Sequence, residues 1–244
     1  THRDLGLLYT KRRQFAHAIR AWSAALTIYD AENYPAQVAR LYCDIAAARR
    51  FLGQGQRAMK DYEQALMALN NLRDDWETRG LVLSNAATAY VEQGDIESAE
   101  AFFNEAIAIA RRTGSEAAEA TRRGNYGWFL LATGRPQQAI AALQYALQIS
   151  KMLRLDLPAA IQTDNLGLAQ DALGNYPRAL EFHEQALELV RPLHQSHWEH
   201  VFATNMALTL LALNRDEEAE PLLSAALQAG RTDEDVEVIV RGLI

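Results

Sequence analysis

The stretch from Asn165 to Leu187 carries the hydrophobic pattern on which the rest of the chain is organised. Its apolar residues recur with a helical period, and the small residues Ala179 and Ala186 lie seven apart, on nearly the same face of a helix. Pro177 stands where a second helix would begin, a position that tolerates a missing N–H. The pattern predicts two amphipathic helices joined by a tight turn at residues 174–176. One hairpin cannot bury its own apolar face, so we expect neighbouring hairpins to cover it.

The same positions return at intervals of 40 or 41 residues. One column is made of amides and one carboxylate: Asp44, Asn85, Asn125, Asn165 and Asn205. Nine residues later comes a turn residue that tolerates a left-handed backbone: Gly53, Gly94, Gly134, Gly174 and Asn214. Two alanine columns follow in register: Ala18, Ala58, Ala99, Ala139, Ala179 and Ala219, then Ala25, Ala65, Ala106, Ala146, Ala186 and Ala226. Four columns in one register identify a repeat protein.

On these residues the chain resembles the tetratricopeptide repeat family. The matching features are Leu166-Gly167 in the first helix, Gly174-x-Tyr176 at the turn, and the two alanines of the second helix. The spacing is similar to the ~40-residue repeats of MalT-type bacterial regulators and LGN-type animal scaffolds. The resemblance implies an all-α, right-handed superhelical solenoid that forms one domain over residues 1–244. The expected repeats span residues 1–30, 36–69, 79–112, 117–150, 159–191 and 197–230, with a partial repeat at 235–244.

Both ends of the chain interrupt a repeat. Residues 235–244 begin another first helix without its partner, and Val238, Ile239 and Leu243 would leave apolar surface uncovered. We therefore expect the sequence to be a piece of a longer protein, with ends that permit self-association.

The charge balance limits the partners. The 244 residues are 49% hydrophobic and 23% charged, with a net charge of −7. The acidic excess lies late in the chain, because residues 123–244 hold 9 Lys and Arg against 15 Asp and Glu. Nucleic-acid binding needs a basic surface, so we expect no nucleic-acid partner for this segment.

The location and redox environment follow from what the chain lacks. No secretory signal opens it, and no apolar run approaches the roughly 20 residues of a membrane span. No membrane partner is therefore predicted. The single cysteine, Cys43, excludes an internal disulfide and favours the cytoplasm.

The sequence contains no recognisable catalytic constellation. Its turn glycines are single, so no phosphate-binding glycine loop is present, and no Ser/His/Asp set can be read. We predict a protein that is not an enzyme and needs no cofactor. The one local group of metal-ligand residues is His194, His197 and His200. Because His194 follows a proline in a connection and i+6 aligns poorly on a helix, half-exposed histidines are the preferred interpretation and a metal site is the weaker one.

The candidate binding residues come from the resemblance. In tetratricopeptide arrays the first helix of each repeat lines a concave groove, which implies a ladder along that groove: Asp44, Asn85, Asn125, Asn165 and Asn205. A primary amide donates and accepts at once, so it can pair with a peptide backbone whatever its side chains. The alternative is that each Asn bonds to the neighbouring repeat and fixes the pitch of the superhelix. Both interpretations stay open.

Residues one helical turn before and after the ladder would form the wall of this groove: Arg40, Leu81, Thr88, Thr121, Trp128, Ile161, Leu168, Val201 and Leu208. Most are apolar or small, which favours an apolar peptide or an amphipathic helix as the ligand. For the leucines, packing between helices is the alternative. The basic residues with which the family's chaperone-tail binders clamp a carboxylate are mostly missing, so we do not expect a chaperone tail as the ligand.

Two classes of function remain. The first is a protein-interaction module that binds a peptide or helical segment in the groove, within a larger regulatory or scaffold protein. The second is an effector-sensing domain of a bacterial transcriptional regulator or signalling ATPase, in which a small ligand changes the superhelix. The domains that flank this segment would decide between them.

Overall fold

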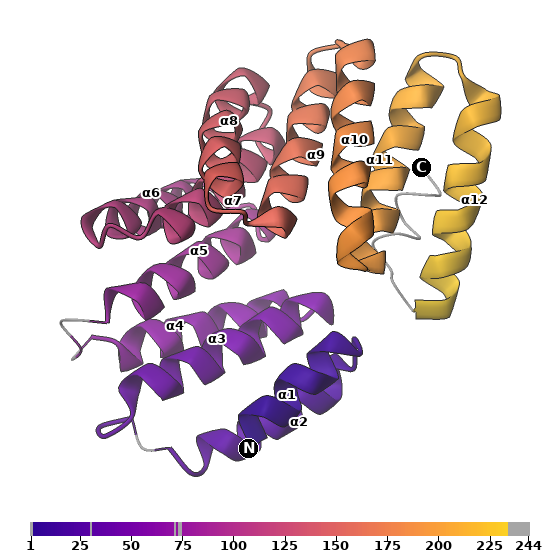
Figure 1. The fold of residues 1–244 in the computed structure, drawn as a ribbon. Coiled ribbons are helices and arrows are strands. Elements are labelled where there is room, and N and C mark those ends of the chain that lie inside the picture. Colours follow the sequence, from indigo (N-terminus) through magenta and orange to yellow (C-terminus); the bar gives the residue numbers. More distant parts are fainter. Residues whose placement is uncertain (1, 30, 71, 73–74, 234–244) are drawn as a thin grey trace. The chain divides into compact units, whose positions relative to one another are not determined.

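A computed structural model describes residues 2–29, 31–70, 72 and 75–233, with the backbone alone for 229–233. This part of the chain is all α: it holds twelve α-helices and one short 3-10 helix, and no strand (Figure 1). The predicted fold class, an all-α solenoid of helical hairpins, is confirmed. The partial repeat at 235–244, and the association predicted for it, lie outside the described residues.

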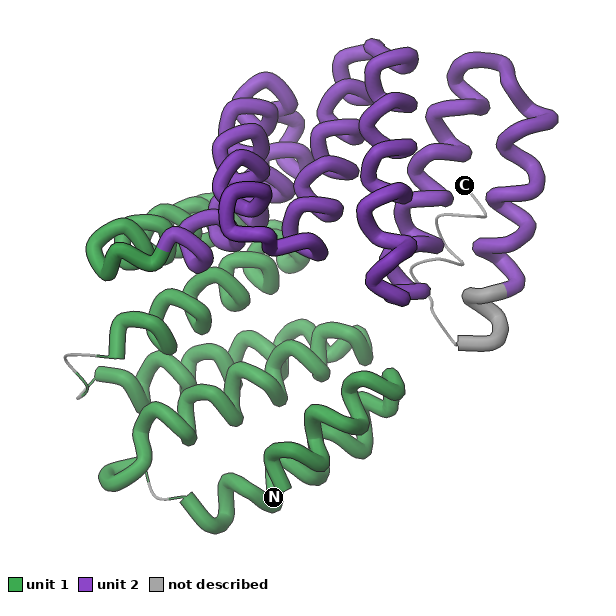
Figure 2. Tube along the Cα trace, in the orientation of Figure 1, with its two compact units in different colours: residues 1–115 green, residues 116–244 purple. Residues whose placement is uncertain are grey.

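The chain divides into two compact units, residues 1–115 and residues 116–244 (Figure 2). The hairpins of unit 1 are α1 (His2–Lys11) with α2 (Phe15–Leu26), α3 (Pro35–Phe51) with α4 (Gly55–Ala68), and α5 (Trp76–Glu92) with α6 (Ile96–Arg112). Those of unit 2 are α7 (Glu116–Ala132) with α8 (Pro136–Met152), α9 (Asp156–Ala172) with α10 (Tyr176–Val190), and α11 (Ser196–Ala212) with α12 (Asp216–Asp233). The 3-10 helix η1 (Arg191–Leu193) connects α10 to α11. Within unit 2 the first helices also contact one another, α7 with α9 and α9 with α11.

Residues with a left-handed backbone end the first helix of the hairpins. Gly94 and Gly174 have φ angles of 80° and 76°, a region that is strained for residues with a Cβ. Asn214 takes the same place in the last hairpin with φ 57°. In the third hairpin the second helix is then capped, because the Asp95 carboxylate accepts a hydrogen bond from the Ser98 N–H at 3.1 Å. These turns fix where each hairpin reverses.

The interior of each hairpin is set by paired small and large residues. All twelve alanines of the two columns are buried, which brings the helix backbones close together. In addition, a small residue of the first helix faces a large residue 16 positions later: a Cβ on Gly127 would lie 2.5 Å from Leu143, and one on Gly167 would lie 2.6 Å from the His183 ring. The large residues at this position are Trp22, Tyr62, Phe103, Leu143 and His183. A histidine therefore stands in α10 where the preceding hairpins bury an apolar or aromatic side chain.

Candidate functional site

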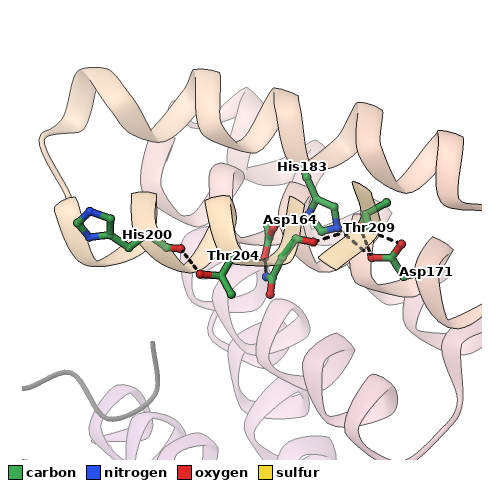
Figure 3. A network of polar contacts seen from close by, with 7 residues as sticks. Asp164, Asp171, His183, His200, Thr204 and Thr209 are labelled. Carbon is green, nitrogen blue, oxygen red and sulfur yellow. Dashed lines mark hydrogen bonds and ion pairs between the residues drawn. The ribbon is translucent and has the colours of Figure 1, made fainter. Parts of the chain in front are cut away.

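His183 lies at the centre of a buried polar network in unit 2 (Figure 3). The ring is 0% exposed, with Nδ1 2.6 Å from Asp164 Oδ1 and Nε2 3.1 Å from Asp171 Oδ2. Both aspartates belong to α9 and are seven residues apart, so they lie on nearly the same face of that helix. Two carboxylates can only accept hydrogen bonds, and both ring nitrogens must then carry a proton. The geometry is that of an imidazolium between two carboxylates.

The protonation of His183 follows from a competition between burial and charge. Burial by itself lowers the pKa of the ring, because it disfavours the charged form. The hydrogen bonds and negative charges of Asp164 and Asp171 outweigh burial and raise the pKa to about 9. His183 is therefore charged at neutral pH.

Helix α11 joins the same network from the following repeat. The Asn205 amide donates to Asp164 Oδ2 at 2.7 Å. The Thr209 hydroxyl donates to Asp171 Oδ2 at 2.8 Å (Figure 3). Thr204 instead bonds within α11, to the backbone carbonyl of His200 at 2.8 Å. The network thus connects α9, α10 and α11 and holds two successive repeats together.

Two amides of the predicted ladder bond to the preceding repeat. Asn205 is 2% exposed and is occupied by Asp164, which lies 41 residues earlier. In unit 1, the Asn85 amide donates to the thiol of Cys43 at 3.3 Å. Cys43 belongs to α3 and lies 42 positions earlier. Cys43 and Asp164 hold equivalent places in their repeats. These two asparagines have the contacts expected of the alternative interpretation, in which the ladder holds neighbouring repeats.

Asn165 differs from both of them. It is 7% exposed, yet no hydrogen bond joins its amide to another residue in the part of the chain that the structure describes. The amide nitrogen and oxygen are not fully buried, so the side chain still reaches solvent. The place that Cys43 and Asp164 hold in other repeats is taken by Gly124, which has no side chain to offer. Asn125, one repeat earlier, is half-buried.

Asp44 occupies the same column at the start of the ladder. It is half-buried, and its Oδ2 is buried without a hydrogen-bond partner among the described residues. Burial raises the pKa of Asp44 to about 6, against the opposing charges of Arg3 and Arg40. In this column Asn85 and Asn205 thus make contacts between repeats, Asn165 has an open amide, and Asp44 is a carboxylate with a raised pKa.

The predicted wall residues are distributed unevenly. In unit 2, Trp128 and Leu168 are half-buried and follow the Asn125 and Asn165 positions by one helical turn, while Thr121 and Leu208 are exposed. Ile161 and Val201 pack with a core cluster, and Val201 is buried there. In unit 1, Leu81 is exposed, Arg40 donates to the Thr78 hydroxyl at 3.1 Å, and Thr88 bonds within its own helix. Trp128 and Leu168 are thus the apolar wall residues nearest in sequence to Asn125 and Asn165.

The three histidines singled out for a metal do not form a common site. His194 is the left-handed residue after η1, with φ 52°, and the His197 ring packs against Trp198 at 5.3 Å. Across the described residues, no group of three or more His, Cys, Asp or Glu side chains is placed to hold a metal ion. The histidine that does organise a site, His183, was not singled out in the sequence.

Comparisons with known proteins give a consistent picture. Two segments, residues 78–152 and 163–193, match models described as tetratricopeptide repeat. No curated protein matches the chain in sequence. A Rap protein complexed with Competence and Sporulation Factor is similar in structure, with a TM-score of 0.79, 14% identity, and coverage of 97% of this chain and 68% of that one.

Two further structures are similar along most of this chain. The Rap conjugation gene regulator of plasmid pLS20, in complex with the Phr* peptide, gives a TM-score of 0.73 at 18% identity, over 86% of this chain and 59% of that one. BtubC (BKLC) from P. vanneervenii gives 0.69 at 22% identity, over 91% and 92%. At these identities the likeness shows the fold.

Proposed function

Because the chain belongs to the tetratricopeptide repeat family, we propose that it is a protein-interaction module whose unit 2 binds the backbone of a peptide or protein segment through α7 and α9. The observation that carries this proposal is the open amide of Asn165. Within the family's fold, repeats bind partners along their first helices, and this amide lies on a first helix.

The chemistry of Asn165 suits a peptide ligand. The Asn165 amide still reaches solvent, so each hydrogen bond that a ligand makes to it contributes a net ~0.5–1.5 kcal/mol to binding. A primary amide donates one hydrogen bond and accepts another, which matches the C=O and N–H of a peptide backbone. The half-buried Trp128 and Leu168, each one turn beyond a ladder position, offer apolar contact to the ligand's side chains. The complexes of the similar Rap proteins with a factor and with a peptide support this kind of partner.

The polar network of α9–α11 is placed to hold helices together rather than to act on a substrate. His183 and Asp164 are buried, and their hydrogen-bonding groups are used by each other and by Asn205. A general base must be within reach of a substrate proton, which this buried imidazolium is not.

None of the described helices combines the length and apolar character that a membrane span requires.

The proposal is tested with peptides selected against the whole chain from a displayed random dodecapeptide library. Asn165→Ala is expected to weaken the selected peptides by about 1–3 kcal/mol, or roughly 5- to 150-fold, because up to two hydrogen bonds are lost. Affinity is measured by calorimetry. Asn104→Ala, at an exposed position of the second helix α6, is the matched control and should bind as the unchanged chain does. Equal affinity of Asn165→Ala and the unchanged chain would overturn the proposal.

A further inference from the structure

We infer that Gly124 decides the availability of Asn165, and that the α7–α9 junction around these two residues is a subsite for one peptide group of the ligand. This inference rests on the proposed function and adds the residue that selects which ladder amide is open. It also specifies the ligand chemistry at that point, a secondary amide rather than a charged group.

The first support is a comparison of equivalent positions within the chain. Asn85 bonds to Cys43, and Asn205 bonds to Asp164, in each case the side chain at one fixed place in the preceding repeat. Gly124 holds that place for Asn165, 41 residues earlier. A glycine presents no acceptor, so the Asn165 amide keeps both of its hydrogen-bonding functions for a ligand.

The second support is an unpaired acceptor beside the same glycine. Gln162 lies on α9 one turn before Asn165 and is 2% exposed. Its Nε2 donates to the Ala120 carbonyl at 3.2 Å and would lie 3.0 Å from a Cβ on Gly124, so its side chain covers this glycine. Its Oε1 is buried with no hydrogen-bond partner in the described part of the chain. Two amides at one junction of α7 and α9 therefore have unused hydrogen-bonding capacity.

The unused groups specify the ligand. Asn165 offers a donor and an acceptor, and Gln162 offers a second acceptor once its flexible end turns toward the ligand. A peptide group supplies an N–H and a C=O together, whereas a carboxylate supplies acceptors alone and an ammonium donors alone.

The test is an NMR titration of the whole chain with N-acetylglycine N-methylamide, a probe with two peptide groups and no side chain. The side-chain amide signals of Asn165 and Gln162 are expected to shift, while those of Asn85 and Asn205 in the same spectrum should not. In Gly124→Ser the new hydroxyl accepts from Asn165, as a side chain at this position does elsewhere, and the apparent affinity for the probe should fall about tenfold, the loss of one hydrogen bond. In Gly124→Ala the new Cβ would lie 3.0 Å from Gln162 Nε2 but brings no acceptor, so Asn165 should lose less of its response than in Gly124→Ser.

The converse variant is in unit 1, where Cys43→Ala removes the acceptor of Asn85. Hydrogen exchange of the Asn85 side-chain amide should then become faster and approach that of Asn165. If Gly124→Ser responds as the unchanged chain does, or if Asn85 exchange does not change in Cys43→Ala, the role of Gly124 is wrong while the proposed function stands. If Asn165 of the unchanged chain does not respond to the probe, the peptide-binding function is contradicted as well.

Discussion

Replacing His183 with alanine is expected to lower the unfolding free energy of the chain by about 3–5 kcal/mol, the loss typical of a buried ion pair from which one partner is removed. The variant leaves Asp164 and Asp171 without the cation that compensates their charges. It also empties the space that Gly167 makes for the ring. Urea unfolding of the full 244-residue chain, followed by circular dichroism, measures this loss.

The neighbouring repeat supplies a matched control. Repeat four holds Gly124, Leu131 and Leu143 where repeat five holds Asp164, Asp171 and His183. The triple variant Asp164→Gly, Asp171→Leu, His183→Leu should be more stable than His183→Ala, because it removes both uncompensated carboxylates and fills the space of the ring with leucine, although Asn205 and Thr209 lose their acceptors. A His183→Ala variant that loses less than about 1 kcal/mol, or a triple variant no more stable than it, would contradict a charged network.

The stability of the chain is expected to fall as the pH rises from about 6.5 to about 9. The folded-state pKa of His183, about 9, is higher than the ordinary histidine value of 6.5, so the native chain binds this proton more tightly than the unfolded chain. The corresponding stabilisation is complete below pH 6.5 and is lost as the pH rises through 9. A shift of this size corresponds to about 3 kcal/mol. Urea unfolding at half-unit pH steps measures the slope.

Other groups must be separated from His183 in this experiment. Asp44 has a raised pKa of about 6, so its contribution changes below the chosen window. Burial raises the pKa of Cys43 to about 12, so its thiol stays neutral in the folded chain while it ionises in the unfolded one at high pH. The triple variant keeps both groups and lacks His183. A slope between pH 6.5 and 9 that is the same in this variant and in the unchanged chain would show that His183 is not the cause.

The repeat architecture could be predicted from the sequence because each column has a simple physical requirement. The turn positions need a left-handed backbone, which Gly94, Gly174 and Asn214 all adopt. The alanine columns need small side chains where two helices meet, and they are buried throughout. Requirements of this kind depend on local conformation and size, so they can be read without knowing the neighbours.

The polar network depends on neighbours, and for that reason it was not predicted. The available signal was a histidine in a column of Trp22, Tyr62, Phe103 and Leu143, together with two aspartates seven residues apart on the preceding helix. A column read for alanine and glycine does not reveal this combination, which needs side chains from α9, α10 and α11 at once.

The division of the ladder could not be predicted for a similar reason. All four asparagines look alike in their own repeats, and what distinguishes Asn165 from Asn205 is the residue 41 positions earlier, Gly124 or Asp164. Val201 likewise carries the pattern of a wall residue, but it is buried in the core cluster that contains Phe202. Contacts between repeats, rather than the repeat pattern itself, decide which residues stay available to a ligand.

The most direct measurement is a comparison of Asn205→Ala and Asn165→Ala in one unfolding experiment on the whole chain. Asn205 donates to a buried carboxylate, so its replacement should lower the unfolding free energy by about 1.5–3 kcal/mol. Asn165 has no such partner among the described residues, and its replacement should change the free energy by less than about 1 kcal/mol. This difference is expected if one amide holds repeats together while the other is open to a ligand. Equal losses in the two variants, or a larger loss for Asn165→Ala, would contradict it.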